Sequence, residues 1–276
     1  MRIYEQVKES KEFLTQFIKQ SISSAIITGS GLSSLEDILT DKVSINFRDI
    51  PHFSQTTVKG HPGRLVFGNI RHESVVLMLG RFHLYEGNTP AQVTFPIRLF
   101  KELGVKNIFL TNAAGGLNPQ YRPGDVILIK DHLNLSGENP LVGPHHENDG
   151  PRFPDMSTAY SPHLREICQM TAKKMNYNLQ EGIYCQVKGP NYETPAEVRM
   201  ISTLGADLVG MSTVQEVLMA HYLGLKICAF SCVSNLAAGL SLQKLLHEDI
   251  ESEVKKSLKV FKELLTNIIG QSTKIT

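Results

Sequence analysis

The chain has 276 residues, of which 41% are hydrophobic and 20% are charged. This is the composition of an ordinary soluble globular protein, and it excludes a fibrous protein or a long disordered tract. The length lies near the upper limit for one α/β domain, so we expect a single domain over residues 1–276. The 28 basic and 27 acidic side chains give a net charge of +1, which argues against nucleic acid or an acidic membrane as a partner.

The cysteines and the N-terminal residues indicate where in the cell the protein is located. The four cysteines form no CxxC pair and have apolar neighbours, so we expect small buried side chains in a reducing environment. They are Cys168, Cys185, Cys228 and Cys232. Residues 1–20 carry charge throughout, unlike a secretory signal, and no run approaches the length of a membrane span. We therefore expect a cytoplasmic protein.

The first half of the chain alternates helical and strand-like patterns. It predicts an amphipathic helix over 2–20 and a second helix over 90–103. Strands are predicted over 24–28, 64–67, 74–79, 107–111 and 125–129. The strands over 64–67 and 74–79 would form a hairpin or lie side by side. The small residues from 112 to 119 are predicted to form a turn.

The second half continues the alternation after a long segment, 135–160, which is rich in Pro, Gly, Asn and His and predicts an ordered functional loop. Helices are predicted over 162–175, 195–204, 214–223 and about 247–269, and strands over 182–187, 207–210 and 226–233. The pattern predicts an α/β layered fold with a mostly parallel or mixed sheet.

Polar or glycine-rich segments follow several predicted strands, where ligands collect in such folds. The first is Gly29-Ser30-Gly31, which is either a phosphate cradle or a plain strand-to-helix turn. The dinucleotide fingerprint requires a glycine where Ser34 stands, which disfavours a nicotinamide cofactor. The second contains Arg81 and His83, which project to the same side of an extended segment and could together bind one phosphate. They could instead be ordinary polar groups on the surface.

Two further segments could bind the rest of a ligand. The turn from Asn112 to Gly116 has open backbone N–H groups for an anion or a sugar hydroxyl, or is only a tight turn. Glu193 and Asn235 each follow a strand, and a carboxylate with a carboxamide can read the edge of a heterocyclic base. Either could instead cap a helix.

Some nearby residues have structural interpretations as well. Thr194 is expected to cap a helix through a capping box. Ser212 precedes another helix and could either cap it, as could Thr213, or bind phosphate. His61 lies in a glycine-rich loop that could fold over a site or face solvent, and His247 could reach a sugar hydroxyl or cap the last helix. His145 and His146 lack the carboxylate and histidine spacing of a metal site, so no metal is assigned.

Taken together and in this order, the segments resemble the trimeric class of purine nucleoside phosphorylases. The matching stretches are GSGLSSL (29–35), GHPGRLVFG (60–68), GRFHLYEG (80–87), TNAAGGLNP (111–119), GDVILIKDHLNL (124–135), GPNYETPAE (189–197), GADLVGMSTVQEV (205–217) and SNLAAG (234–239). The likeness covers about residues 20 to 265. It implies a single α/β domain with a twisted mixed sheet flanked by helices, assembled as a homotrimer.

The resemblance also implies site residues. The phosphate site would consist of Ser30, His61, Arg81, His83, the backbone at Ala113, and Ser212. The nucleoside would be bound by Tyr85, Phe153 from a neighbouring subunit, Tyr192, Glu193, Met211, Asn235 and His247, with His83, Glu193 and Asn235 as the catalytic residues. Phosphate would be a co-substrate, and no cofactor or metal is required.

This chain departs from parts of the family pattern. Leu236 stands where vertebrate members carry a lysine, Tyr192 stands where several relatives have Phe, and the segment around His247 is less similar.

The implied reaction is phosphorolysis of purine ribonucleosides and deoxyribonucleosides such as inosine and guanosine, in purine salvage. A methylthioadenosine phosphorylase would carry an aspartate where Asn235 stands. A xanthosine-preferring relative and a non-catalytic nucleoside-binding protein remain alternatives.

Overall fold

The computed structural model of the chain describes residues 3–18, 20–57, 62–145, 149–240 and 247–272. The helices are α1 (Ile3–Thr15), α2 (Pro90–Glu102), α3 (Pro162–Lys174), α4 (Pro195–Thr203), α5 (Val214–Tyr222) and α6 (His247–Ser272). The strands are β1 (Ser24–Ile27), β2 (Thr40–Asn46), β3 (Arg64–Ile70), β4 (Glu73–Leu79), β5 (Asn107–Gly116), β6 (Val126–Asn134), β7 (Gln180–Gln186), β8 (Leu208–Gly210) and β9 (Lys226–Leu236).

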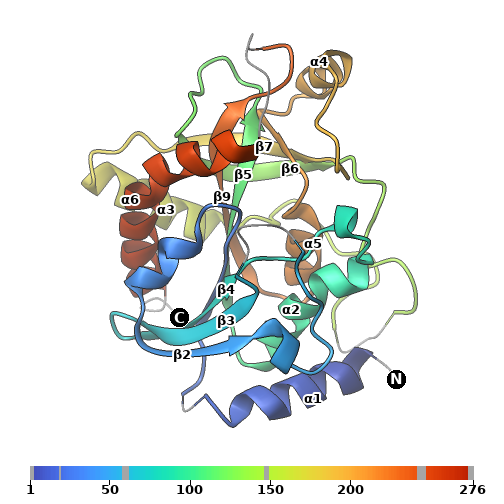
Figure 1. Cartoon of the computed structure of the whole chain (residues 1–276), viewed down its shortest axis with the longest axis vertical. Coiled ribbons are helices and arrows are strands. Elements are labelled where there is room, and N and C mark those ends of the chain that lie inside the picture. Colours follow the sequence, from blue (N-terminus) through green and yellow to red (C-terminus); the bar gives the residue numbers. More distant parts are fainter. Residues whose placement is uncertain (1–2, 19, 58–61, 146–148, 241–246, 273–276) are drawn as a thin grey trace.

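Within the described residues these strands form one mixed sheet, in the order β2-β3-β4-β1-β5-β8-β7-β6-β9, with helices around it (Figure 1). β3 and β4 form the antiparallel hairpin that the sequence allowed, while β1 is parallel to both β4 and β5. The predicted mixed α/β architecture is therefore confirmed.

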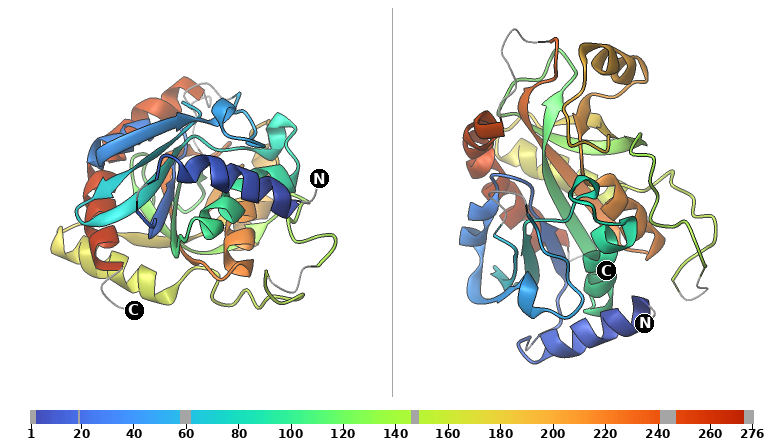
Figure 2. Two further views of the ribbon diagram at one scale, coloured as in Figure 1. Left: turned by 90° about the horizontal axis from the view of Figure 1, so that it is seen from below. Right: turned by 45° about the vertical axis from the view of Figure 1, so that its right-hand side comes forward.

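The sheet closes on itself around β5 and β9. These two strands pair in parallel from Asn107 opposite Lys226 to Gly116 opposite Leu236. β5 also pairs with β8, and β7, β6 and β9 follow in order, so five strands complete a ring. In Figure 1 and in the right-hand view of Figure 2, α4 lies at the top of the molecule and α1 at the bottom, so they are at opposite ends.

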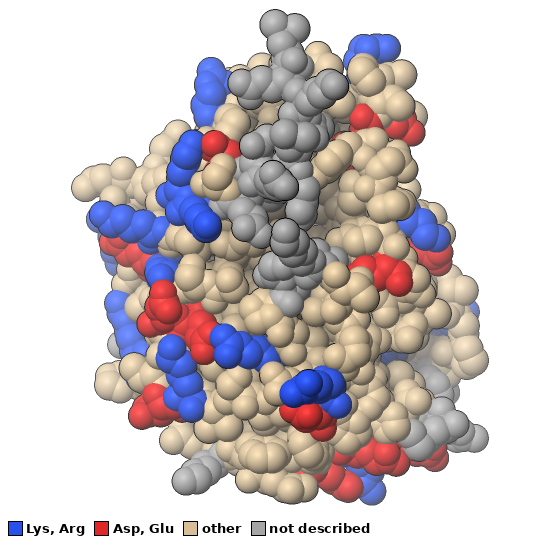
Figure 3. Space-filling view, in the orientation of Figure 1, with Lys and Arg blue, Asp and Glu red and all other residues tan. Residues whose placement is uncertain are grey.

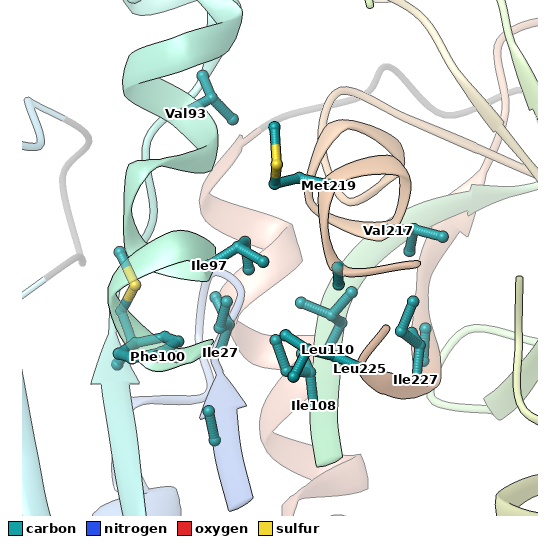
Figure 4. Close-up of a cluster of buried hydrophobic side chains, with 14 of the residues drawn as sticks. Ile27, Val93, Ile97, Phe100, Ile108, Leu110, Val217, Met219, Leu225 and Ile227 are labelled. Carbon is teal, nitrogen blue, oxygen red and sulfur yellow. The ribbon is translucent and has the colours of Figure 1, made fainter. Parts of the chain in front are cut away.

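Helices cover both faces of the central strands because successive side chains of a strand point to opposite faces. Leu110 of β5 belongs to a buried cluster with side chains of α2 and α5, including Ile97 and Val217 (Figure 4). Its neighbour Phe109 belongs to a second cluster with Phe261 of α6. This two-sided core fixes β5 and β9 in place, and with them the strand ends that carry polar residues.

The helix starts follow local rules. The capping box predicted at Thr194 is confirmed, since its hydroxyl accepts from the backbone N–H of Glu197 at 3.3 Å and Glu197 Oε2 accepts from the backbone N–H of Thr194 at 2.7 Å. Thr89 begins α2 with a similar box, and a proline follows both caps at the first helical position. The cap at Thr194 fixes the chain just after Glu193.

Several predicted boundaries are wrong. Residues 112–116 do not form a turn: they continue β5, because pairing with β9 supplies their backbone hydrogen bonds. β6 and β9 also continue beyond their predicted ends, to Asn134 and Leu236. The first helix is shorter than predicted, since bonds from Gln16 and Phe17 to residues three positions earlier tighten its last turn.

One strand was not predicted at all. β2 lies at the edge of the sheet, and only Ile45 among its residues is buried. It therefore lacks both the apolar run of a central strand and a clear alternation of buried and exposed side chains.

The surface carries both signs of charge. On the face shown in Figure 3, Lys and Arg side chains are interspersed with Asp and Glu rather than separated from them. No helix in the described ranges combines the length and the apolar character that crossing a bilayer requires.

Candidate active site

A cavity of about 420 Å³ opens where several strands end. Its walls come from the segments after β1, β4 and β7, from the last residues of β5 and β9, and from β8 and the residues after it. Because β1, β4, β5 and β9 run in parallel, their carboxyl ends meet at one edge, the usual ligand site of such sheets.

Most residues singled out in the sequence line this one cavity. They are Ser30, Arg81, His83, Tyr85, Ala113, Tyr192, Glu193, Met211, Ser212 and Asn235. The fold thus brings together side chains that are far apart along the chain.

Three of the expected site residues are not seen in the cavity. Phe153 is 88% exposed, between β6 and α3, and does not line it. His61 lies outside the described residues. His247 is the first residue of α6, but its side chain is not among those described.

Arg81 is a buried cation at one end of the cavity, with only 1% of its surface exposed. Its Nη1 donates to Ser212 Oγ at 2.8 Å and to Thr213 Oγ1 at 3.0 Å. Its Nη2 donates to the carbonyl oxygens of Thr111 at 2.8 Å and Ile27 at 3.3 Å. These bonds hold the guanidinium in one orientation, and a fixed buried guanidinium suits an anion such as phosphate.

His83, beside Arg81 in the cavity wall, is held by Glu86. Glu86 Oε1 accepts from the His83 backbone N–H at 3.0 Å and lies 2.8 Å from His83 Nδ1. Glu86 Oε2 accepts from the backbone N–H and the hydroxyl of Thr57, both at 2.7 Å. Burial opposes ionisation of Glu86, but these hydrogen bonds outweigh it and lower its pKa to about 2.

The electrostatics favour a neutral His83. Burial lowers the pKa of the imidazole, although the hydrogen bond with Glu86 acts in the opposite direction. When Nδ1 carries the proton that Glu86 accepts, Nε2 is a hydrogen-bond acceptor for a protonated ligand oxygen.

The cap alternative for Ser212 and Thr213 is wrong. Gln186 Oε1, at the end of β7, instead accepts from the first two backbone N–H groups of α5, at 2.9 and 3.3 Å. Thr213 has a φ of 80°, and its hydroxyl accepts from Arg81 and, at 2.9 Å, from Asn112 Nδ2. The Ser212 hydroxyl remains at the cavity wall, in contact with the guanidinium.

A bulge in β9 aims polar side chains into the cavity. Between Val233 and Asn235 the register with β5 shifts, so Ser234 is an extra residue in β9. Ser234 Oγ donates to the carbonyl oxygen of Ala114 at 3.3 Å and accepts from Asn235 Nδ2 at 3.0 Å. The carboxamide of Asn235 is thereby oriented at the cavity wall.

Glu193 lines the same cavity and lies directly before the cap of α4. Burial raises the pKa of its carboxyl. The preceding segment comes close to Met211: Gly189 has a φ of 71°, and a Cβ there would collide with the Met211 sulfur, so glycine suits this position. Glu193, Met211 and Tyr192 together offer a hydrogen-bond acceptor beside two flat or apolar surfaces.

Sequence analysis did not single out Ser234 or Val209, although both line the cavity. A Cβ at Gly115 would meet Val209 Cγ1 at 3.3 Å and Asn235 Oδ1 at 3.4 Å, so this glycine keeps the space between β8 and β9 open. Their positions next to Gly210 and Asn235 at strand ends are the signal that could have found them. Among the described side chains, no group of three or more His, Cys, Asp and Glu is placed to hold a metal ion.

Comparison with known proteins identifies the class. The family model of the phosphorylase superfamily matches residues 23–270, so the chain belongs to that superfamily.

Individual relatives place it more closely. The chain is 44% identical over 267 residues to purine nucleoside phosphorylase 1 of Bacillus subtilis (strain 168), covering 97% of this chain and 98% of that protein. It is 48% identical over 237 residues to the purine nucleoside phosphorylase of Bos taurus, covering 84% and 82%. The structure of Schistosoma mansoni purine nucleoside phosphorylase in complex with adenosine matches with a TM-score of 0.91 and 39% identity over 96% of both chains. The chain therefore belongs to the purine nucleoside phosphorylase family.

The low pKa of Glu86 predicts a pH-dependent contribution to stability. A carboxyl whose folded pKa lies below its ordinary value of 4.5 stabilises the fold above that pH, and the contribution is lost as the pH falls from 4.5 toward 2. We expect Glu86→Gln to lower the Tm by roughly 5 °C at pH 7, because charged hydrogen bonds to His83 and Thr57 are lost. The Tm difference from the wild type should shrink below pH 4.5, as measured by differential scanning calorimetry across pH.

The matched control is Glu102→Gln, which removes an exposed carboxylate from its pair with Lys11. It should change the Tm by less than about 1 °C at every pH. A Glu86→Gln deficit that is the same at pH 7 and pH 3.5 would contradict the assigned charge state.

Proposed function

We propose that this chain catalyses phosphorolysis of purine ribonucleosides and deoxyribonucleosides, with inosine and guanosine as substrates, in purine salvage. The products are the free base and (deoxy)ribose 1-phosphate. Family membership supports the reaction class, since relatives from bacteria, mammals and yeast all carry the name purine nucleoside phosphorylase.

The observation that carries the proposal is a single cavity lined by two chemically different sets of side chains, which we call the phosphate wall and the base wall. One wall has the buried guanidinium of Arg81 with Ser212, and the other has the Glu193 carboxyl and the Asn235 carboxamide. A nucleoside and phosphate need this pairing, because the anion must stand on the opposite side of the sugar from the base.

The phosphate wall would position the nucleophile. Arg81, His83, Ser212, Ser30 and the backbone at Ala113 would bind the phosphate so that one oxygen faces C1′ of the ribose. As the glycosidic C–N bond breaks and the C–O bond to phosphate forms, C1′ gains positive charge, which the phosphate charge stabilises.

The electron pair of the broken C–N bond stays on the departing purine, which the base wall would stabilise. Asn235 would hydrogen-bond N7 or O6 of the leaving purine, where negative charge develops, and Glu193 would accept the N1–H of a 6-oxopurine. Tyr192 and Met211 would pack on base and sugar. Tyr85 and His247 would bind ribose hydroxyls, with His61 beside the phosphate.

The asparagine at position 235 supports 6-oxopurines over 6-aminopurines, since an aspartate would suit a base protonated at N7. The same side chain argues against the methylthioadenosine alternative.

We further propose that the protein is a homotrimer in the cytoplasm. It would use inorganic phosphate as co-substrate and need no cofactor. Phe153 is 88% exposed in the 135–160 segment, and Val142 in the same segment is 82% exposed, which supports a subunit contact there. The four cysteines are all free and buried, which supports a reducing compartment.

The direct test is the release of hypoxanthine from inosine with and without phosphate. Phosphate-dependent release, with stoichiometric ribose 1-phosphate, is the expected result. Release that needs no phosphate would instead indicate a hydrolase, and no release would indicate a nucleoside-binding protein.

Substitutions at Asn235 test the base wall. Asn235→Ala should reduce kcat/KM for inosine by about 10²- to 10³-fold, because a hydrogen bond to the developing charge is lost. Asn235→Asp should shift the preference toward adenosine, since the carboxylate accepts from a protonated N7.

Steady-state kinetics with inosine and adenosine measure both effects. Asn69→Ala, on β3 and outside the cavity, is the control and should behave like the wild type. Wild-type rates in Asn235→Ala, or an unchanged inosine-to-adenosine ratio in Asn235→Asp, would refute the assignment.

Phe153→Ala tests the proposed subunit contribution. If this ring completes a neighbour's site, its removal should raise KM for inosine about tenfold while the oligomeric state is kept, because one apolar contact to the nucleoside is lost. Kinetics together with light scattering after size exclusion make the measurement. Met200→Ala, which removes a half-exposed apolar side chain on α4, is the control. An unchanged KM, or a fully active monomer, would contradict this part of the proposal.

A further inference from the structure

Glu216 is a buried carboxylate next to the proposed phosphate site that no step above uses. It lies in the first turn of α5 and is 2% exposed. Its Oε1 is 3.7 Å from Arg81 Nε, and its Oε2 has no hydrogen-bond partner among the described residues. Glu216 does not line the cavity, so it faces the guanidinium from behind the wall.

Burying Glu216 in this way costs free energy, which only a compensating interaction can offset. A buried carboxylate is strongly desolvated, and an oxygen without a donor loses the hydrogen bonds that water gave it. The four hydrogen bonds that Arg81 donates within the wall, described above, go to neutral groups, two hydroxyls and two carbonyls. A carboxylate at position 216 is therefore not needed to orient the Arg81 guanidinium. It is needed to balance the buried positive charge of that guanidinium.

The other titratable groups described nearby do not pair with Arg81. Glu86 is ionised, but its oxygens contact His83 and Thr57 instead. Burial raises the pKa of Tyr160 well above its usual value and also raises that of Tyr184, so both phenols are neutral at pH 7. Burial lowers the pKa of His83, so the imidazole does not add a cation. Arg81 and Glu216 thus form an ion pair of zero net charge beside these neutral rings.

We propose that Glu216 is the internal counter-ion of Arg81 and that it weakens the binding of phosphate to the site. It is a positioning residue that acts through the guanidinium and does not touch the substrate. When a phosphate dianion reaches Arg81, it meets a pair that is already neutral and is repelled by the carboxylate behind it. The same carboxylate keeps the empty site folded, since the guanidinium is never left as an uncompensated buried charge.

The inference rests on the proposed function of the cavity as a phosphate site. Neutralising Glu216 should strengthen phosphate binding. If Glu216 instead stabilised the bound phosphate, neutralising it would weaken that binding.

The test is Glu216→Gln, which keeps the side-chain shape and removes the charge. Isothermal titration calorimetry with inorganic phosphate, without nucleoside, should show a Kd lowered roughly 3- to 10-fold. In steady-state assays KM for phosphate should fall by a similar factor while KM for inosine stays unchanged. Without phosphate the variant should have a lower Tm than the wild type, and saturating phosphate should raise its Tm by more.

Two controls separate charge from shape. Glu216→Asp keeps the charge on a shorter side chain, so its phosphate Kd should stay within about twofold of the wild type. Glu181→Gln breaks the 2.8 Å pair with Arg165 at the start of β7, away from the cavity, and should leave the phosphate Kd unchanged. A larger change in Glu216→Asp than in Glu216→Gln would show that shape decides and would overturn the proposal.

The outcomes also separate this inference from the proposed function. If the wild-type protein binds no phosphate, the cavity is not a phosphate site, and the proposed function is contradicted as well. Wild-type protein that binds phosphate, with weaker or equal binding by Glu216→Gln, would overturn only the counter-ion role. A Glu216→Gln chain that folds only when phosphate is present supports the proposal, and one that stays unfolded in saturating phosphate contradicts it.

Discussion

The parallel pairing of β5 with β9 is the constraint on which the rest of the site depends. It places the backbone at Ala113 and the side chain of Asn235 on neighbouring strands, and the bulge at Ser234 turns both polar side chains of β9 toward the cavity. Arg81 donates to the carbonyl of Thr111 on the same β5, so the cation is tied to the same strand. The anion-binding and base-reading walls therefore share one rigid support.

Local patterns predicted the helices and the central strands but not the ends of those strands. Residues 112–116 look like a turn because they are small and include two glycines, yet their backbone pairs with β9 and β8 on the two sides of β5. This pairing depends on residues more than 90 positions away along the chain, so no local pattern contains it. The edge strand β2 was missed for the converse reason, since most of its side chains face solvent.

Sequence patterns likewise predicted some residues of the site, while others became apparent only from the structure. Glycine and charge patterns at strand ends pointed to Arg81, Glu193 and Asn235, but their separate roles came from the resemblance to a family, because each residue alone also had a structural interpretation. Glu216 and Ser234 were not among the site residues predicted from the sequence. One becomes visible only through its distance to Arg81, and the other only through the register shift with β5.

The central claim is that one sugar can lie between an anion held by Arg81 and a purine held by Asn235. The most direct measurement is a crystal structure of the protein with sulfate and hypoxanthine bound together. We expect sulfate in contact with Arg81 and Ser212, and hypoxanthine in contact with Glu193 and Asn235, in the same cavity with room for a ribose between them. Ligands in separate cavities, or a purine on the guanidinium, would contradict it.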